Sequence, residues 1–226
     1  MTSPSTLQGT WDTDRASEAP RRAQLRPTNY ARSIFHFSSA AVGLTCVAFL
    51  PSRGWLTFIA VGFAAYSWSM EVGRRISPAL NDRLMRFYGP VAHAHERYRV
   101  NSATWYATSL VVLALAASRP AMMAALAVLG VADPIAALVG RRWGRRELRA
   151  GRSLEGTLAF IASGSLAAAI ALIVVASGPV GSIAGLAAVA GLTGAVAELF
   201  STRLDDNLTI PVSVGLVVTA ASLVVA

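Results

Sequence analysis

The residues best suited to chemistry in this sequence are carboxylates inside or beside long apolar segments. Asp133 lies within one apolar run, Glu198 lies near the end of another, and Asp206 follows soon after it. A charged side chain at the centre of a membrane helix costs about 3 kcal/mol on insertion scales. Such a residue generally serves a site or an ion pair, so we take all three as candidate catalytic residues.

Asp133 shares a predicted helix face with Gly130, Ala137 and Gly140, which are spaced three and four residues apart. Small residues around a carboxylate would leave room for a ligand to approach the backbone. The alternative is a packing helix whose single aspartate is paired with another group.

Glu198 is predicted at the C-terminal end of a helix, where the helix dipole disfavours negative charge and a bound cation would relieve the strain. Asp206 or Asn207 would cap the following helix, with Pro211 in its first turn. Capping is a strong alternative to a ligand role for Asn207, but it does not explain Glu198.

The segment Arg152–Thr157 opens another apolar run, with Ser153 as its predicted N-cap. Free N–H groups at a helix start bind phosphate, Arg152 adds charge and Gly156 permits close approach. The arginines just before this segment are explained as topology charges or as contacts with anionic lipid headgroups.

Several other polar residues stand at the starts of predicted helices. His36 follows Arg32 by four residues and shares its helix face, although a lone histidine is more often structural than catalytic. Glu96, Asn101 and Thr104 lie around the start of a later helix. The topology derived below gathers these residues near one membrane face, which favours a cytoplasm-facing site over a transport path.

About seven transmembrane helices in an all-α bundle are predicted to position these residues. Of the 226 residues, 54% are hydrophobic and 14% are charged, whereas soluble domains carry about 25% charged residues. Many apolar runs approach the roughly 20 residues that cross a bilayer core. The predicted spans are 34–50, 55–72, 102–118, 121–140, 156–177, 180–200 and 209–226.

All the basic residues are arginine, and they concentrate in alternate gaps between the spans. The positive-inside rule then predicts a cytoplasmic N-terminus and an external C-terminus, in a multi-pass protein of a bacterial-type inner membrane. Residues 1–33 are predicted to be a disordered cytoplasmic tail, and 34–226 the transmembrane domain. The net charge of +8 reflects these topology charges and does not indicate a nucleic-acid partner.

Small residues in the sixth predicted span are typical of close helix contact in lipid. Gly181 and Gly185 form a GxxxG pair, and Gly191 and Gly194 follow. We expect all four to serve helix packing.

Four ordered segments resemble the signature of the CTP-dependent polyprenol kinases, a group that includes dolichol kinase, phytol kinase and CTP-dependent diacylglycerol kinases. Related bacterial proteins include phosphatidate cytidylyltransferases. The resemblance runs from about Arg32 to the end of the chain, and Arg152 stands where the family usually has lysine. The segments are Arg32 with His36, Asn101–Tyr106, Val131–Gly144 followed by Arg152–Thr157, and Glu198 with Asp206–Pro211.

The resemblance implies a lipid-alcohol kinase that uses CTP and Mg²⁺. Asp133, Glu198 and Asp206 would hold the metal, and a carboxylate or His36 would accept the proton of the lipid hydroxyl. The two rival activities are CDP-lipid formation by a phosphatidate cytidylyltransferase and a non-enzymatic or transport role. The implied nucleotide-binding residues are Gly140, Arg152, Ser153, Glu155, Gly156 and Asn207, and the implied substrate-binding or supporting residues are Arg32, Glu96, Asn101 and Thr104.

Overall fold

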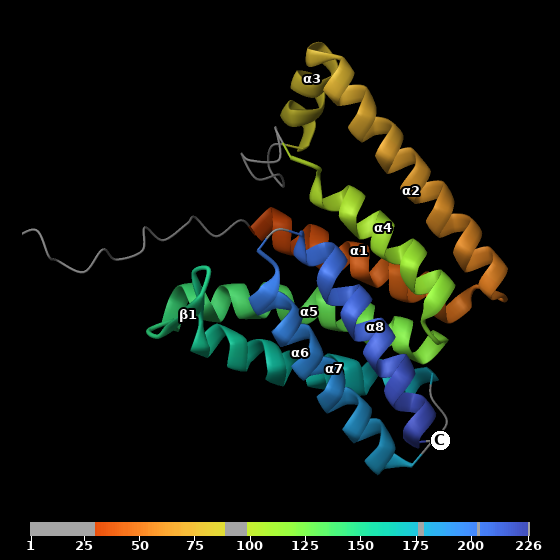
Figure 1. Cartoon of the computed structure of the whole chain (residues 1–226), viewed down its shortest axis with the longest axis vertical. Helices are drawn as coiled ribbons and strands as arrows, with labels where there is room; N and C mark the ends of the chain where they lie inside the picture. Colours follow the sequence, from red (N-terminus) through yellow and green to blue (C-terminus); the bar gives the residue numbers. More distant parts are fainter. Residues whose placement is uncertain (1–29, 89–98, 176–178, 203, 226) are drawn as a thin grey trace, which may run out of the picture.

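The computed structural model describes residues 30–88, 99–175, 179–202 and 204–225. These ranges form eight α-helices and one two-stranded antiparallel sheet (Figure 1). The elements are α1 (Tyr30–Phe49), α2 (Arg53–Ile76), α3 (Pro78–Tyr88), α4 (Ser102–Ala116), α5 (Arg119–Trp143), β1 (Glu147–Arg149), β2 (Arg152–Ser153), α6 (Leu154–Val175), α7 (Val180–Phe200) and α8 (Asp206–Val225).

Each of the seven predicted spans is an α-helix, and the predicted span 180–200 agrees with α7 at both ends. The helix α1 begins at Tyr30, before the predicted boundary at residue 34. Four helices, α5 to α8, are long and apolar enough to cross a membrane, while α4 and the described apolar part of α1 are shorter. The helix α3 and the β1–β2 hairpin were not predicted.

Several helix starts follow from ordinary capping chemistry. Ser52, Asn101 and Ser118 each accept a hydrogen bond from a backbone N–H in the first turn of α2, α4 and α5, respectively. The side chain of Asn101 therefore has a structural role as an N-cap, beside the substrate role that the sequence suggested.

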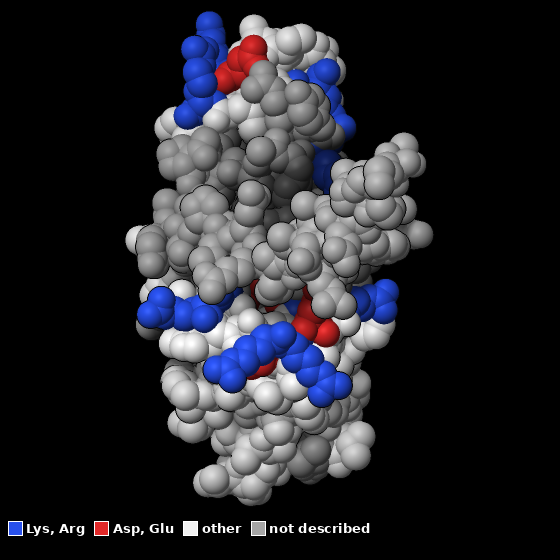
Figure 2. All heavy atoms as spheres, turned by 90° about the vertical axis from the view of Figure 1, so that its left-hand side faces the viewer, with Lys and Arg blue, Asp and Glu red and all other residues white. Residues whose placement is uncertain are grey.

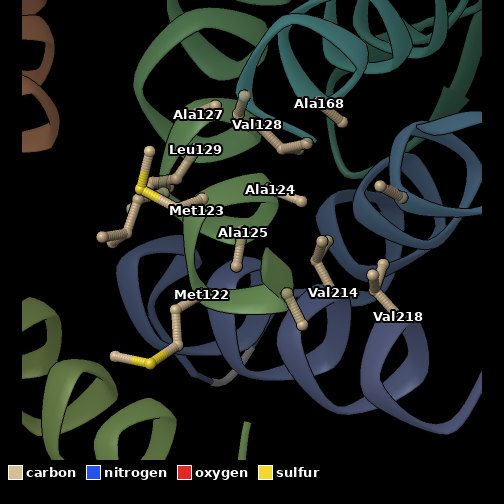
Figure 3. Close-up of a cluster of buried hydrophobic side chains, with 14 of the residues drawn as sticks. Met122, Met123, Ala124, Ala125, Ala127, Val128, Leu129, Ala168, Val214 and Val218 are labelled. Atoms are coloured by element: carbon tan, nitrogen blue, oxygen red, sulfur yellow. The ribbon is translucent and has the colours of Figure 1, made fainter. Parts of the chain in front are cut away.

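The helix α5 lies at the centre of the bundle and packs against α1, α6 and α8. Figure 3 shows Ala124 and Val128 of α5 on the side of Ala168 of α6 and Val214 of α8, while Met122 and Met123 point away from them. Large apolar side chains on the outer faces are exposed, among them Phe58 on α2 and Leu166 on α6. A soluble monomer rarely exposes so much apolar surface, so these faces fit contact with lipid.

Two of the four glycines predicted to pack helices do so. A Cβ atom on Gly191 would lie 2.2 Å from the Ser165 hydroxyl, and one on Gly194 would lie 2.7 Å from the Phe160 ring. The prediction was wrong for Gly181 and Gly185, because within the described chain a Cβ atom on either would meet nothing within 4 Å.

A buried ion-pair network joins α2 to the start of α4. Glu71 is 2% exposed and receives two hydrogen bonds from the Arg74 guanidinium and one from Arg75, each at 2.8 Å. It also accepts the backbone N–H of Asn101 at 3.3 Å, and Arg74 donates to the Arg99 carbonyl. These bonds satisfy Glu71 inside the protein, so we assign it to folding.

Candidate functional site

Arg152 joins two of the three predicted carboxylates at one end of the bundle. Its Nη2 donates to Asp206 Oδ2 at 2.7 Å, and its Nε lies 3.2 Å from Glu198 Oε1. A third contact runs from Nη1 to the Ser201 carbonyl at 3.4 Å. The Arg152 guanidinium supplies positive charge beside Glu198, and the bound cation predicted there stays a prediction.

A short hairpin sets the position of Arg152. The turn between β1 and β2 consists of Ala150 and Gly151, whose φ values of 52° and 78° are both in the left-handed region. Two such residues are typical of a tight hairpin turn, and glycine adopts this conformation without strain. The returning strand is only Arg152 and Ser153, and α6 begins immediately after it.

Ser153 is the N-cap of α6, as predicted. Its hydroxyl accepts the Gly156 N–H at 3.1 Å, and the Leu154 N–H donates to the Arg146 carbonyl at 2.8 Å. Glu155 accepts the backbone N–H groups of Arg145 and Arg146. The Leu154 and Gly156 amides at the start of α6 are therefore already in use. Arg152 is the stronger candidate for a phosphate contact.

The glycines of this junction are required by helix packing. A Cβ atom on Gly156 would lie 3.0 Å from the Ala136 carbonyl, and one on Gly140 would lie 3.1 Å from the Ser153 hydroxyl. A Cβ atom on Gly130 would meet Ala40 of α1 at 2.3 Å. Neighbouring helices therefore fill the space beside Gly130 and Gly140, and nucleotide contact by Gly140 or Gly156 stays a prediction.

Four buried polar side-chain atoms in the described part of the chain have no hydrogen-bond partner, and all belong to residues at this end of the bundle. They are Arg141 Nε of α5, Thr157 Oγ1 of α6, Glu198 Oε2 of α7 and Asp206 Oδ1 of α8. Unsatisfied buried polar atoms are rare in folded proteins and require an explanation. Their concentration on four adjoining helix ends marks this end of the bundle as the candidate site, where water or a polar ligand would complete their hydrogen bonding.

Asp133 belongs to the same electrostatic cluster. It interacts repulsively with both Glu198 and Asp206, and its side chain is half-buried with no hydrogen bond or ion pair to the described residues. Pro134 follows it inside α5 and cannot donate to the Gly130 carbonyl. A structural aspartate in an apolar helix would be paired, so the isolation of Asp133 favours a functional role.

The donor set at this site suits a magnesium ion held partly by substrate. No group of three or more His, Cys, Asp or Glu side chains forms a ready metal cage within the residues described. Mg²⁺ is generally held by one or two carboxylates together with substrate phosphates, and Glu198 and Asp206 each keep one buried oxygen without a partner. The residues therefore fit a metal that arrives with a nucleotide.

The cap of α8 is Asp205, which corrects the prediction that Asp206 or Asn207 caps this helix. Asp205 Oδ1 accepts the Asn207 backbone N–H at 3.0 Å and its side-chain amide at 2.6 Å. Its Oδ2 accepts the Ser102 hydroxyl at 2.8 Å, which ties α8 to α4. Pro211 lies inside α8, beyond its first turn. Freed from capping, Asp206 turns its carboxylate toward Arg152.

The remaining predicted residues are dispersed around this centre. His36 lies one turn from Ala40, which packs on Gly130, so α1 brings His36 to the same level as Asp133. Thr104 is buried in α4. Glu96 lies outside the described residues, and for Arg32 only the helical backbone is described.

A polar cavity of about 620 Å³ adjoins Asp206. Figure 2 faces this end of the molecule, where acidic side chains are visible between groups of basic ones. From the sequence, the two arginines of this cavity were expected to be topology charges, and Trp105 was only part of a family-like segment. Their common location was not predicted, because they come from separate segments that only the fold brings together. The cavity is lined by Arg75, Arg99, Val100, Trp105, Thr202, Leu204, Asp205 and Asp206.

The fold and site together define a helical membrane protein with a buried arginine–carboxylate centre. The chain is 30% identical over 214 residues to a phytol kinase of Synechocystis sp., and the match covers 91% of this chain and 85% of that protein. The chain therefore belongs to the polyprenol and phytol kinase family. No family model matches the chain, and no solved structure matches it.

Proposed function

We propose that this protein is a CTP-dependent kinase that phosphorylates the hydroxyl of a membrane lipid alcohol at the cytoplasmic face. The acceptor would be phytol, another polyprenol or diacylglycerol. The observation that carries the proposal is the cluster of unpartnered buried polar atoms around Arg152, Glu198 and Asp206 in a chain of this family. Phosphoryl transfer needs positioned charges of both signs, and this cluster supplies them.

In the proposed reaction, the lipid hydroxyl oxygen attacks the γ-phosphorus of CTP. The bond between that phosphorus and the bridging β–γ oxygen breaks, CDP leaves, and the hydroxyl proton passes to a protein base. Asp133, another carboxylate of the cluster, or His36 would accept this proton. Bound Mg²⁺ would neutralise phosphate charge, held by oxygens of Asp133, Glu198 and Asp206.

Nucleotide binding would change the partners of Arg152. The guanidinium now neutralises Glu198 and Asp206, and a phosphate is an equally suitable partner for its planar fork. We infer that Arg152 turns to the nucleotide phosphates while the two carboxylates turn to the metal. The polar cavity beside Asp206, with Arg75 and Arg99 on its wall, would receive the rest of the nucleotide.

We also propose that α1, α2 and α4 cross the membrane with α5 to α8, which gives seven spans and a cytoplasmic N-terminus. Antiparallel packing of α1 on α5 agrees with alternating spans, because Ala40 lies opposite Gly130 and Gly43 lies opposite Leu126. The helices α5 and α6 are also antiparallel, because Gly140 lies opposite Gly156 and Ala132 lies opposite Gly164. The arginine-rich hairpin and the carboxylates would then face the cytoplasm together.

The deciding experiment is product analysis on the purified full-length protein with Mg²⁺, CTP labelled at the α- or γ-phosphate, and a panel of phytol, polyprenols, diacylglycerol and phosphatidate. A kinase transfers the γ-label to an alcohol and releases CDP. Transfer of the α-label to phosphatidate with release of pyrophosphate would instead establish a cytidylyltransferase. Absence of both turnover and nucleotide binding would favour a non-enzymatic protein, and equal turnover with ATP would refute the preference for CTP.

A further inference from the structure

Two apolar grooves lie on opposite sides of α1. The first, which we call the α1–α2 groove, has a volume of about 510 Å³ and is lined by residues of α1, α2, α4 and α5, including Val42, Cys46, Leu56 and Met122. The second, the α1–α6 groove, has a volume of about 390 Å³ and is lined by residues of α1, α5 and α6, including Ala41, Ala127 and Ile135. Both are almost entirely apolar.

The α1–α2 groove is a wedge that is closed at the end away from the carboxylates. There, Arg119 donates to the Leu50 carbonyl, and Arg53 donates to the carbonyls of Ala114 at 2.8 Å and Ala117 at 2.5 Å. From this end α1 packs mainly on α5 and α2 packs mainly on α4, so the two consecutive helices diverge (Figure 1). The helices α1 and α2 therefore separate toward the end of the bundle that carries the site.

The floor of this groove leads along α5 to Asp133. Met122 lines the groove, and Leu126 lies beside Gly43 of its α1 wall. Residues spaced four, seven and eleven apart lie on one face of an α-helix, so Met122, Leu126 and Asp133 form one continuous stripe. The stripe is apolar at Met122 and Leu126 and ends at the Asp133 carboxylate.

The α1 wall leads in the same way to His36. Gly43 and Val47 line the groove, and they follow His36 by seven and eleven residues on the same helix face. Near this end the Tyr106 hydroxyl of α4 crosses to donate to the Ser39 carbonyl of α1 at 3.1 Å. The groove thus has its polar groups at the end where a lipid hydroxyl would lie.

The α5 residues that line the α1–α6 groove do not, for the most part, share a helix face with Asp133. Its α5 residues include Ala127, Val131 and Ile135, which are spaced by four and share a face. At about 100° per residue, that face is roughly opposite the one that carries Asp133. Of the other α5 residues in the groove, Met123 and Gly130 lie nearer the Asp133 face, but Gly130 is covered by Ala40 of α1. A chain lying in this groove would end on the wrong side of α5 for its hydroxyl to reach Asp133.

We infer that the α1–α2 groove binds the apolar tail of the lipid alcohol, with its hydroxyl between His36 and Asp133. This inference rests on the proposed lipid-alcohol kinase function and names the part of the protein that selects the acceptor. The α1 wall of the groove runs from Phe35 to Leu50, about 22 Å at 1.5 Å per residue, which suits a long branched isoprenoid chain. Its opening between diverging helices would admit the acceptor sideways from the bilayer.

Photo-crosslinking tests the location without requiring turnover. The full-length protein in lipid nanodiscs is irradiated with a phytol analogue that carries a diazirine at the end of its tail, and the adducts are mapped by mass spectrometry. Adducts at Cys46, Leu50 or Leu56, removed by excess phytol but not by an alkane of equal length, are expected. Adducts concentrated in the α1–α6 groove, or spread without competition over the whole apolar surface, would overturn the inference.

Two neighbouring residues of α1 provide matched variants, because Val42 lines the α1–α2 groove and Ala41 lines the α1–α6 groove. We expect Val42→Trp to lower kcat/KM for phytol about tenfold or more, while changing it less than about twofold for a short monoterpenoid alcohol. Ala41→Trp should change neither value by more than about twofold. The reverse pattern would reject the assignment. If the unmodified protein phosphorylates no alcohol, the proposed function fails, whereas the crosslinks still report separately on the groove.

Discussion

Arg152 and Asp206 form a hydrogen-bonded ion pair of 2.7 Å between two segments that are far apart in the sequence. The same guanidinium also neutralises Glu198, which is only 7% exposed. One side chain of a two-residue strand thus links the start of α6 to the end of α7 and the start of α8. Replacing the Arg152 side chain would affect both the stability of the fold and the proposed chemistry. Different substitutions separate these two effects.

Replacing Arg152 by alanine should destabilise the protein and abolish turnover. The change leaves Glu198 as a buried carboxylate without a cation, which typically costs about 3–5 kcal/mol. Arg152→Lys keeps the charge but not the planar fork, so we expect it to restore folding and at least about a tenth of the activity. Thermal unfolding in detergent and turnover with CTP measure the two effects.

The matched control is Arg149→Ala in the same hairpin. The Arg149 guanidinium lies over the Phe200 ring, 4.7 Å from its centroid, and makes no ion pair with the described residues. Its loss should leave both stability and turnover close to normal. If Arg152→Ala behaved like this control, the assignment of Arg152 to the site would be wrong.

Glu71→Gln should separate a structural carboxylate from the functional ones. The buried Arg74 and the partly exposed Arg75 would lose their charged partner, and breaking a buried pair typically costs about 3–5 kcal/mol. We expect a lower melting temperature and lower yield, with kcat of the folded fraction within about twofold of normal. A stable variant with a greatly reduced kcat would instead assign Glu71 to catalysis.

The hydrophobic pattern predicted the helices well, because apolar runs in this chain are long and polar residues are concentrated between them. It did not predict α3, a short amphipathic helix of eleven residues, or the hairpin, whose turn is formed by Ala150 and Gly151. Neither element has the length or hydropathy that marks a span.

The site was predictable only in part. Residue type shows that a charge is costly to bury in an apolar helix, but it does not show which other residue pairs with that charge. An aspartate or glutamate in an apolar helix is conspicuous in a sequence, and Asp133 and Glu198 were found in this way. The contact of Arg152 with both Glu198 and Asp206 depends on how the ends of α6, α7 and α8 meet, which no local pattern encodes. For the same reason the cap of α8 was predicted one or two residues too late, at Asp206 or Asn207 instead of Asp205.

Reporter fusions test the proposed topology. The arginine distribution predicts that a fusion after Ala226 lies outside the cytoplasm and that one inserted after Gly151, at the tip of the hairpin, lies inside. Alkaline phosphatase should therefore be active at the first position and inactive at the second, and a cytoplasmic fluorescent reporter should give the opposite result. Phosphatase activity at Gly151 with none at Ala226 would invert the orientation.

Asp133→Asn is the most direct test of the site. The substitution keeps the size of the side chain and its capacity for hydrogen bonding, but removes the charge that a metal needs. Since Asp133 makes no ion pair with the described residues and is repelled by Glu198 and Asp206, losing its charge should not harm folding. We therefore expect normal insertion and thermal stability, with activity reduced about a hundredfold, the scale of lost electrostatic stabilisation.

Raising the Mg²⁺ concentration should restore part of the activity of Asp133→Asn if the carboxylate acts through the metal. The control is Glu147→Gln in β1. Among the described residues, its carboxylate accepts only the Gly151 N–H, in the exposed hairpin outside the cluster. This variant should show normal activity and no unusual dependence on Mg²⁺. Near-normal turnover by Asp133→Asn would remove Asp133 from the mechanism, and loss of folded protein would show that its charge has a structural partner.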